Sequence, residues 1–306
     1  MAAKPGLDDA TTAKLLLVAL SFCWGLSWPA IRIGLDELSP WTMRLFGYAL
    51  GALTLLALLQ LQGRSLGIPR GRSWLHIIIA SFPNVVSFGL FGTFAQLSAM
   101  TSRVIIVNYS MPIRSSLMAW LVLRERITPQ AALGLALCVG GLTVLVYPVM
   151  EASLSEPIGL LLALGCAYSW AAGTIYMKWA RIEGDLLAIT FWQVVVGVVV
   201  FSIGVLIFRS PLQIEPLQLR TWLAIAFNGM FGTGLAYFIW FNIIGRLSTA
   251  TASLGSLANP VVGVIGSAVI LGERPTVPDM IGFALIFVAA ACVLIPQRER
   301  PPPPDV

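Results

Sequence analysis

Eight polar or aromatic side chains lie near the middle of otherwise apolar runs of this 306-residue sequence. They are Trp24, Asn84, Asn108, Tyr109, Tyr168, Trp170, Tyr237 and Asn259. Amide groups can hydrogen-bond both the ammonium and the carboxylate of a zwitterion, and aromatic rings can enclose its side chain. The set therefore predicts a binding site for a small polar molecule. The same residues could instead join helices by hydrogen bonds or fill space between them, and that alternative stays open.

The residue types that enzymes and metal sites require are scarce. The sequence has one histidine, and its 14 aspartates and glutamates all fall in tails, loops or the ends of apolar runs. It contains no GxSxG, HExxH or Walker pattern. Four isolated cysteines stand within apolar runs, which is typical of buried free thiols: Cys23, Cys138, Cys166 and Cys292. We therefore expect no enzyme activity, no metal and no cofactor.

The composition indicates a protein that lies in a lipid bilayer. Hydrophobic residues make up 58% of the chain, charged residues only 11%, and the mean hydropathy is +0.86. A soluble domain carries about a quarter charged residues, so this chain could not cover a water-facing surface. The net charge of +5 sits in short loops and forms no basic face, which argues against nucleic acid as a partner.

Ten apolar runs are long enough to cross a bilayer, for which roughly 20 residues are needed. They cover about 14–33, 40–62, 73–97, 101–123, 129–149, 157–178, 187–208, 219–242, 249–271 and 276–296. No small-residue cleavage site follows the first run, so it is expected to be a retained helix and not a signal peptide. Residues 298–306, with four consecutive prolines, are predicted to form a disordered cytoplasmic tail.

The positions of lysine and arginine predict the orientation in the membrane. Of these 19 residues, 12 fall in the termini and in loops on the N-terminal side, and 5 fall on the opposite side. The remaining two, Arg44 and Arg114, lie inside runs. Both termini are therefore predicted to be cytoplasmic. We expect Arg44 to extend outward toward the interface, and Arg114 to pair with backbone carbonyls that Pro112 frees.

The chain repeats itself. Moving 148 positions along the sequence takes Thr101 to Thr249, Pro112 to Pro260, Glu125 to Glu273 and Gly134 to Gly282, and an offset of 146 takes Trp24 to Trp170. Residues 1–150 and 151–297 thus form two five-helix copies. Because five is odd, the second copy enters from the opposite face. Inverted repeats of this kind are typical of secondary transporters, which bind substrate near the midplane and work by alternating access.

Two prolines and two glutamates recur within this repeat. Pro112 and Pro260 each remove a backbone donor inside a run, and either form symmetric hinges or simply shape their helices. Glu125 and Glu273 stand just before the next run, where a carboxylate can cap the amides of the following helix; a gating ion pair is the alternative. Five tryptophans near run ends are interpreted as interfacial anchors: Trp28, Trp41, Trp74, Trp179 and Trp222.

Proton coupling has one candidate residue. No carboxylate lies mid-run, so a carboxylate proton relay is not expected. His76, near the start of the third run, belongs to a residue type that titrates near neutrality, but beside Trp74 it could equally be an interfacial anchor. The hypothesis we favour is facilitated transport down a gradient.

Four segments carry a recognisable pattern: FCWGLSWPAIR at 22–32, Ser39-Pro40 with Arg44, LRERITPQ at 123–130 and LGERPT at 271–276. They resemble the EamA family of the drug/metabolite transporter superfamily. Arg124 stands where that family more often has a small residue, as Gly272 does in the second copy. The resemblance implies a ten-helix carrier of small metabolites. Many relatives export amino acids, and the aromatic-rich helices resemble the branch that exports aromatic and other neutral ones.

Taken together, the sequence predicts an all-α integral membrane protein of ten helices in two inverted repeats. Its expected function is the export of neutral or aromatic amino acids by alternating access, with the small molecule and the bilayer as its partners. A monomer in a bacterial inner membrane is expected to be sufficient. A carrier of nucleosides, vitamins or drugs, an importer and a proton-coupled carrier remain alternatives. A membrane-embedded enzyme is a distant one.

Overall fold

The computed structural model describes residues 9–68, 71–124, 127–149, 155–208, 216–244 and 257–294, and every element in these ranges is a helix. The first copy contains α1 (Asp9–Gly34), α2 (Pro40–Leu61), α3 (Arg72–Ser81), η1 (Phe82–Ser87), α4 (Phe88–Ser98), α5 (Thr101–Asn108), α6 (Met111–Leu123), α7 (Pro129–Val146) and η2 (Tyr147–Val149). The second contains α8 (Ser155–Ala180), α9 (Leu186–Ile207), α10 (Leu219–Ala226), η3 (Phe227–Leu235), α11 (Ala236–Ile244), α13 (Ala258–Leu271) and α14 (Val277–Leu294). Glu125, Thr249 and the tail 298–306 lie outside the described residues.

Within the described ranges, seven helical stretches are long and apolar enough to cross a membrane. They are Leu15–Gly34, Pro40–Leu61, Arg72–Ser98, Pro129–Val146, Glu156–Ala180, Leu186–Ile207 and Leu219–Ile243, and two shorter apolar helices cover Ala258–Leu271 and Val277–Cys292. Large apolar side chains point away from the protein interior along them, including Leu53, Leu161, Leu206 and Val269. Lipid tails can cover such side chains, whereas water cannot do so without cost. The protein is an integral membrane protein.

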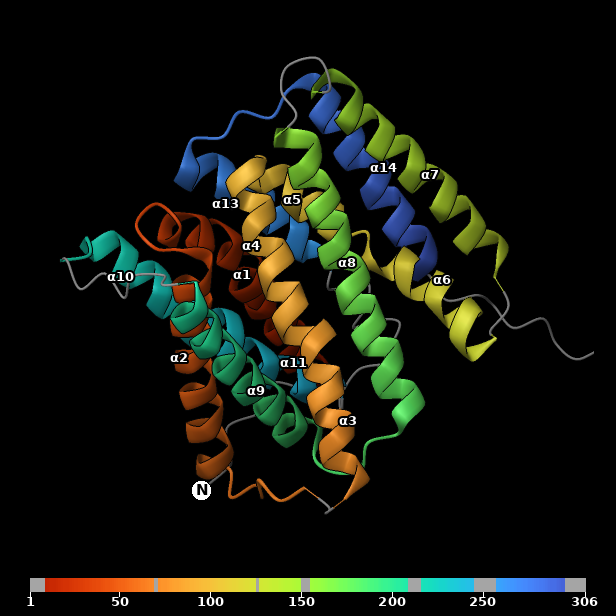
Figure 1. The fold of residues 1–306 in the computed structure, drawn as a ribbon. Helices are drawn as coiled ribbons and strands as arrows, with labels where there is room; N and C mark the ends of the chain where they lie inside the picture. Colours follow the sequence, from red (N-terminus) through yellow and green to blue (C-terminus); the bar gives the residue numbers. More distant parts are fainter. Residues whose placement is uncertain are drawn as a thin grey trace, which may run out of the picture.

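Glycines allow the helices to pack closely. Figure 1 shows α7 and α14 running side by side, apart from the helices around α1. A Cβ atom on Gly141 of α7 would stand 3.0 Å from the Gly282 carbonyl of α14, and one on Gly282 would stand 3.1 Å from the Gly141 carbonyl. Close backbone approach between small residues is the usual way in which helices associate in membranes. Similar contacts join α1 to α13 at Gly25.

The expected helix over 101–123 is broken in two. It ends at Asn108, turns through Tyr109 and Ser110, and begins again at Met111 with Pro112 in the first turn of α6. A proline is tolerated in a first turn because the amide there has no intrahelical acceptor. Arg114 donates from Nη1 to the Ser110 carbonyl over 3.3 Å. Arg114 thus pairs with backbone beside the break, but with the carbonyl of Ser110, whereas the carbonyl that loses its donor at Pro112 is that of Asn108.

Two π-helical segments interrupt the third and eighth runs, which the sequence did not lead us to expect. They are η1, which contains Pro83, and η3, which contains three glycines. Segments of this kind widen the helix by one residue per turn and are frequent at functional sites. They occupy corresponding places in the two copies, between α3 and α4 and between α10 and α11. Both therefore reshape a helix at mid-length.

Arg124, the irregular residue of the first motif, has the same backbone conformation as its counterpart Gly272. It ends α6 in the left-handed region at φ 58°, and Gly272 ends α13 in the same region at φ 71°. Glycine adopts this conformation without steric cost, whereas arginine does not. The two copies therefore end the corresponding helices in the same way, and the side chain at this position in the first copy adds strain.

A buried ion cluster joins the two halves at the end predicted to face outward. Arg103 of α5 donates from Nε and Nη2 to Asp279 of α14, over 2.6 and 2.9 Å, and from Nη1 to Glu156 of α8 over 2.8 Å. Beside it, Glu273 accepts hydrogen bonds from the backbone amides of Thr101 and Ser102, over 2.6 and 2.9 Å.

Glu273 therefore caps α5 of the other half. We had expected it to cap α14, the helix that follows it in sequence, and that prediction is wrong. The start of α14 is capped locally instead. The Thr276 amide donates to Asp279 over 2.8 Å, and the Asp279 amide lies 3.4 Å from the Thr276 hydroxyl, which is the reciprocal arrangement of a capping box. Because α14 is capped locally, the Glu273 carboxylate can bind the start of α5 and so join the second copy to the first.

Candidate substrate cavity

A cavity of about 480 Å³ lies between the helices in the described part of the chain. It is enclosed by helices of both halves: α1, α2, α4 to α6, α8, η3, α11 and α13. Its volume falls within the roughly 300–1,000 Å³ typical of small-molecule sites. Six of the eight residues predicted to bind a small molecule line it: Trp24, Asn108, Tyr109, Trp170, Tyr237 and Asn259.

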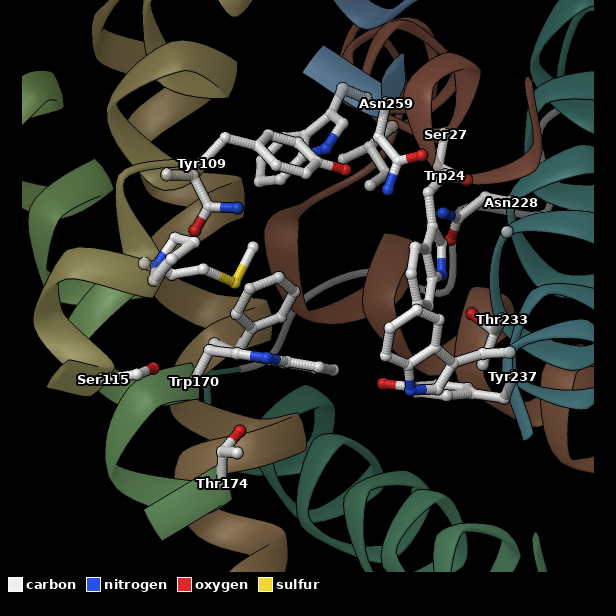
Figure 2. Close-up of a pocket in the computed structure, with 18 of the residues that line it drawn as sticks. Trp24, Ser27, Tyr109, Ser115, Trp170, Thr174, Asn228, Thr233, Tyr237 and Asn259 are labelled. Atoms are coloured by element: carbon white, nitrogen blue, oxygen red, sulfur yellow. The ribbon is translucent and has the colours of Figure 1, made fainter. Parts of the chain in front are cut away.

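Aromatic rings form the apolar walls of this cavity. Trp170 of α8 and Tyr237 of α11 lie nearly parallel, with ring centroids 6.4 Å apart. Trp24 of α1 meets Tyr237 edge-on at 6.2 Å and lies 5.6 Å from Trp240. Figure 2 shows Trp24, Trp170 and Tyr237 approaching one another from three helices. These four rings provide flat apolar faces for a ring or an aliphatic side chain of comparable size.

Amide groups from the two copies supply polar atoms at the other end of the cavity. Asn108 ends α5 and Asn259 lies in the first turn of α13, and both side chains are 1% exposed. The side-chain oxygen of each accepts no hydrogen bond within the described residues. The Tyr109 hydroxyl faces Asn259 (Figure 2). A buried carbonyl oxygen without a donor costs free energy, so both oxygens would gain by accepting a hydrogen bond from a bound molecule once their side chains turn toward the cavity that they line.

Two predicted binding residues, and the candidate for coupling, do not line this cavity. Asn84 donates from Nδ2 to Oε1 of Gln193 over 3.0 Å, which joins η1 to α9. Tyr168 is 44% exposed, and the Arg114 guanidinium lies 5.4 Å from its ring centroid. His76 shares a hydrogen bond of 2.7 Å with Tyr176 through Nδ1. Substrate contact at Asn84 and coupling at His76 stay predictions, whereas Tyr168 could contact a substrate only outside this cavity.

Arg44 and Trp28 take positions that differ from those expected. Arg44 does not extend to the interface but is 5% exposed and lines the cavity. Trp28 is no interfacial anchor either, since it is 6% exposed and packs against Phe88 at 6.3 Å. We had expected both side chains to reach the membrane interface because both residues lie toward the end of an apolar run. Position along a run gives depth only, and the direction around the helix axis decides between lipid and interior.

Small hydroxyl side chains complete the lining and could not be singled out from the sequence. They are Ser27, Ser115, Ser116, Thr174 and Thr233, and the amide of Asn228 lines the cavity as well. Ser115 and Thr174 lie at the lower end of the cavity in Figure 2, on α6 and α8. Both helices run from there toward the side predicted to be cytoplasmic. The cavity thus extends toward that side, while the ion cluster around Arg103 ties the opposite side together.

The two prolines lie beside this cavity at corresponding positions. Pro112 lines it, and Pro260 is buried in the first turn of α13 directly after Asn259. The residues equivalent to α5 in the second copy, 249–256, all lie outside the described ranges. Whether either proline acts as a hinge stays a prediction.

Comparison with protein families gives one match that covers most of the chain. The EamA-like transporter family matches residues 11–147 and again residues 157–295. The chain belongs to the EamA-like transporter family. The double match agrees with the duplication in the sequence, and the resemblance found there is confirmed.

Individual relatives are transporters by name. An uncharacterized transporter, YoaV, of Bacillus subtilis is 22% identical over 88% of this chain and 92% of its own length. A probable amino-acid metabolite efflux pump of Escherichia coli is 24% identical over 91% of this chain and 92% of its own. One crystal structure has the same fold, with a TM-score of 0.64 at 20% identity over 92% of this chain and 96% of that one.

Proposed function

We propose that this EamA-like transporter exports neutral and aromatic amino acids by alternating access around the cavity between its halves. The observation that carries the proposal is a cavity with aromatic walls at one end and unpaired amide oxygens at the other. An amino acid with an apolar side chain presents complementary groups to these two ends. The printed name of the Escherichia coli relative, a probable amino-acid metabolite efflux pump, supports the same class of substrate.

The proposal includes the finer architecture predicted from the sequence. We assign residues 1–150 and 151–297 to two inverted copies that together cross the membrane ten times. The seven long apolar helices, the two shorter ones and the broken pair α5–α6 provide these ten crossings. Inverted copies around a shared cavity support a mechanism in which the halves exchange roles. Pro112 and Pro260 are proposed to act as the hinges of that exchange.

We propose that the structure corresponds to the inward-facing state of the carrier. The ion cluster of Arg103, Glu156 and Asp279 closes the side predicted to be outer. The cavity extends past Ser115 and Thr174 toward the other side. A cytoplasmic amino acid could enter such a state directly, which suits export. Both termini are proposed to be cytoplasmic in a bacterial inner membrane, and one copy of the chain holds the whole cavity.

Transport is proposed to need no carboxylate proton relay. Among the described residues, no aspartate or glutamate lines the cavity, and His76 is engaged with Tyr176 outside it. The test is flux of a labelled amino acid in proteoliposomes with and without a pH gradient. We expect similar rates, and strong acceleration by the gradient would contradict this part of the proposal.

The substrate class can be tested by binding to purified protein in detergent. Trp24, Trp28, Trp170 and Trp240 line the cavity, so occupancy should change tryptophan fluorescence. We expect saturable changes with phenylalanine and leucine and none with uridine or thiamine. Saturation with a nucleoside or a vitamin, and none with the amino acids, would assign another substrate class.

A further inference from the structure

Arg44 is a cation held inside the cavity. It lies in the first turns of α2, its side chain is buried, and Nε donates to the Gly89 carbonyl over 3.0 Å and to the Thr93 hydroxyl of α4. Its guanidinium carbon lies 5.8 Å from the centroid of the Tyr48 ring. These contacts fix the position of the side chain, and they use the one nitrogen nearest to the aliphatic stem.

No carboxylate neutralises this charge within the described residues. The ion pairs there join Arg32 to Asp36, Arg64 to Asp185, and Arg103 to Glu156 and Asp279. A buried charge in a membrane protein is costly unless it is paired, and such residues usually mark a substrate or ion pathway. Tyr48 and the Gly89 carbonyl lower this cost only in part, because neither carries a formal charge.

Arg114 is a useful contrast because it is buried to a similar degree. It is 6% exposed, against 5% for Arg44. Its Nη1 donates to Cys138 Sγ over 3.1 Å and to the Ser110 carbonyl. Arg114 does not line the cavity, whereas Arg44 does. One terminal nitrogen of Arg114, Nη1, is thus used within the protein while its Nε is buried without a partner. In Arg44 the pattern is reversed, because Nε is held and neither Nη group makes a hydrogen bond within the described residues.

We propose that Arg44 binds the carboxylate of the transported molecule, an inference that rests on the function proposed above. With Nε held by Gly89 and Thr93, the two Nη groups form a fork that matches the two oxygens of a carboxylate. Nη2 and the Trp28 ring both lie 3.5 Å from the point where a Cβ on Gly92 would stand. The backbone of Gly92 therefore lies directly beside the guanidinium, and a side chain there would contact both the guanidinium and the Trp28 ring.

The amino group of the substrate has weaker partners in this arrangement. The unpaired oxygens of Asn108 and Asn259 can accept hydrogen bonds from an ammonium, and aromatic faces attract a cation. Among the residues that the structure describes, no carboxylate lines the cavity to form an ion pair with it. Recognition therefore depends more on the carboxylate than on the amine. An organic acid without an amine should bind, and an amine without a carboxylate should not.

Binding of four ligands of similar size to the wild-type protein, measured by tryptophan fluorescence, tests whether recognition depends more on the carboxylate than on the amine. The ligands are phenylalanine, 3-phenylpropionate, phenylalaninamide and phenethylamine. We expect phenylalanine to bind at least about tenfold more tightly than its amide, because the amide cannot form the charge-assisted bidentate pair with the guanidinium. We expect 3-phenylpropionate to bind and phenethylamine to give no saturable signal. Equal binding of phenylalanine and its amide would overturn the assignment of Arg44 while leaving amino-acid binding intact.

Two variants assign the selectivity to Arg44. Arg44→Gln keeps a donor for the Gly89 carbonyl but removes the charge, and should reduce the ratio between phenylalanine and its amide to about threefold or less. Arg44→Lys should keep part of the ratio, and Arg114→Lys, outside the cavity, should keep all of it. A full ratio in Arg44→Gln would overturn the proposal. Failure of the wild type to bind any of the four ligands would refute the proposed substrate class itself.

Discussion

Tyr237 and Trp170 are the residues through which the cavity should recognise an apolar side chain. Their rings lie almost parallel, and Trp24 closes the third side. Removal of one ring takes away both buried area and the specific geometry of an aromatic contact, which alone is worth about 0.5–1.5 kcal/mol. We therefore expect Tyr237→Ala to weaken phenylalanine binding by about tenfold and Tyr237→Phe to change it little.

Tyr168→Ala provides the matched control for this experiment. Tyr168 is an aromatic residue of the same helix as Trp170, but it is exposed and does not line the cavity. Its truncation should leave the dissociation constant of phenylalanine within about twofold of the wild type. If Tyr168→Ala weakened binding as much as Tyr237→Ala, the cavity described here would not be the substrate site.

At the scale of single residues, the sequence predicted which polar and aromatic side chains lie at mid-depth better than it predicted which neighbours each side chain faces. Six of eight predicted residues line the cavity because polar atoms at mid-depth must face an interior space. Asn84 also faces the interior, but it meets Gln193 there and not open space. Which of these two environments an amide meets depends on the packing of α9 against η1. A pattern along one chain segment does not contain that information.

The packing of α7 on α14 gives an element-scale prediction. A Cβ on Gly141 would stand 2.7 Å from Cγ1 of Ile286 as well as close to the Gly282 backbone. Its neighbour Gly140 has nothing within 4 Å of the same position. We expect Gly141→Ala to lower the free energy of unfolding by about 1–3 kcal/mol. The measurement is thermal unfolding of purified protein in detergent.

Gly140→Ala is the control on the same turn of α7. It should be neutral or slightly stabilising, by up to about 1 kcal/mol, because alanine is the better helix former and nothing stands in the way. Equal losses of stability in the two variants would mean that α7 and α14 do not approach through these glycines.

Helix positions were largely predictable, and their internal irregularities were not. Apolar run length predicts where a helix crosses the membrane, and Pro112 correctly marked the break between α5 and α6. Pro83 and the glycines of η3 also occur in the sequence, but they do not distinguish a π-helical segment from a bend. Glu273 illustrates the same limit, since it caps a helix 172 positions away from it in sequence. Its backbone partners become neighbours only in the folded protein.

At the scale of the whole molecule, the ion cluster should hold the outer side closed. Arg103 and Asp279 are both buried and belong to opposite halves (Figure 1, α5 and α14). Removal of one partner of a buried pair costs about 3–5 kcal/mol in the state that contains it. We therefore expect Asp279→Asn to shift the population toward a state open to the outer side.

A cysteine at Ile31 reports that shift in a variant that lacks the four native cysteines. Ile31 lines the cavity and is 4% exposed. A membrane-impermeant thiol reagent added outside should label it in the Asp279→Asn background and not with Asp279 present. Asp36→Asn is the control, because the exposed Arg32–Asp36 pair on the same side contributes little. Equal labelling with and without Asp279 would show that the cluster is not the outer closure.

Counterflow in proteoliposomes tests the central claim most directly. Vesicles that contain this protein are loaded with unlabelled phenylalanine or leucine and diluted into a trace of the labelled compound. A carrier that alternates around the cavity between its halves should accumulate the label transiently, and Tyr237→Ala should reduce the rate while Tyr168→Ala should not. If no neutral or aromatic amino acid gave counterflow while a nucleoside or a vitamin did, the proposed substrate would be wrong.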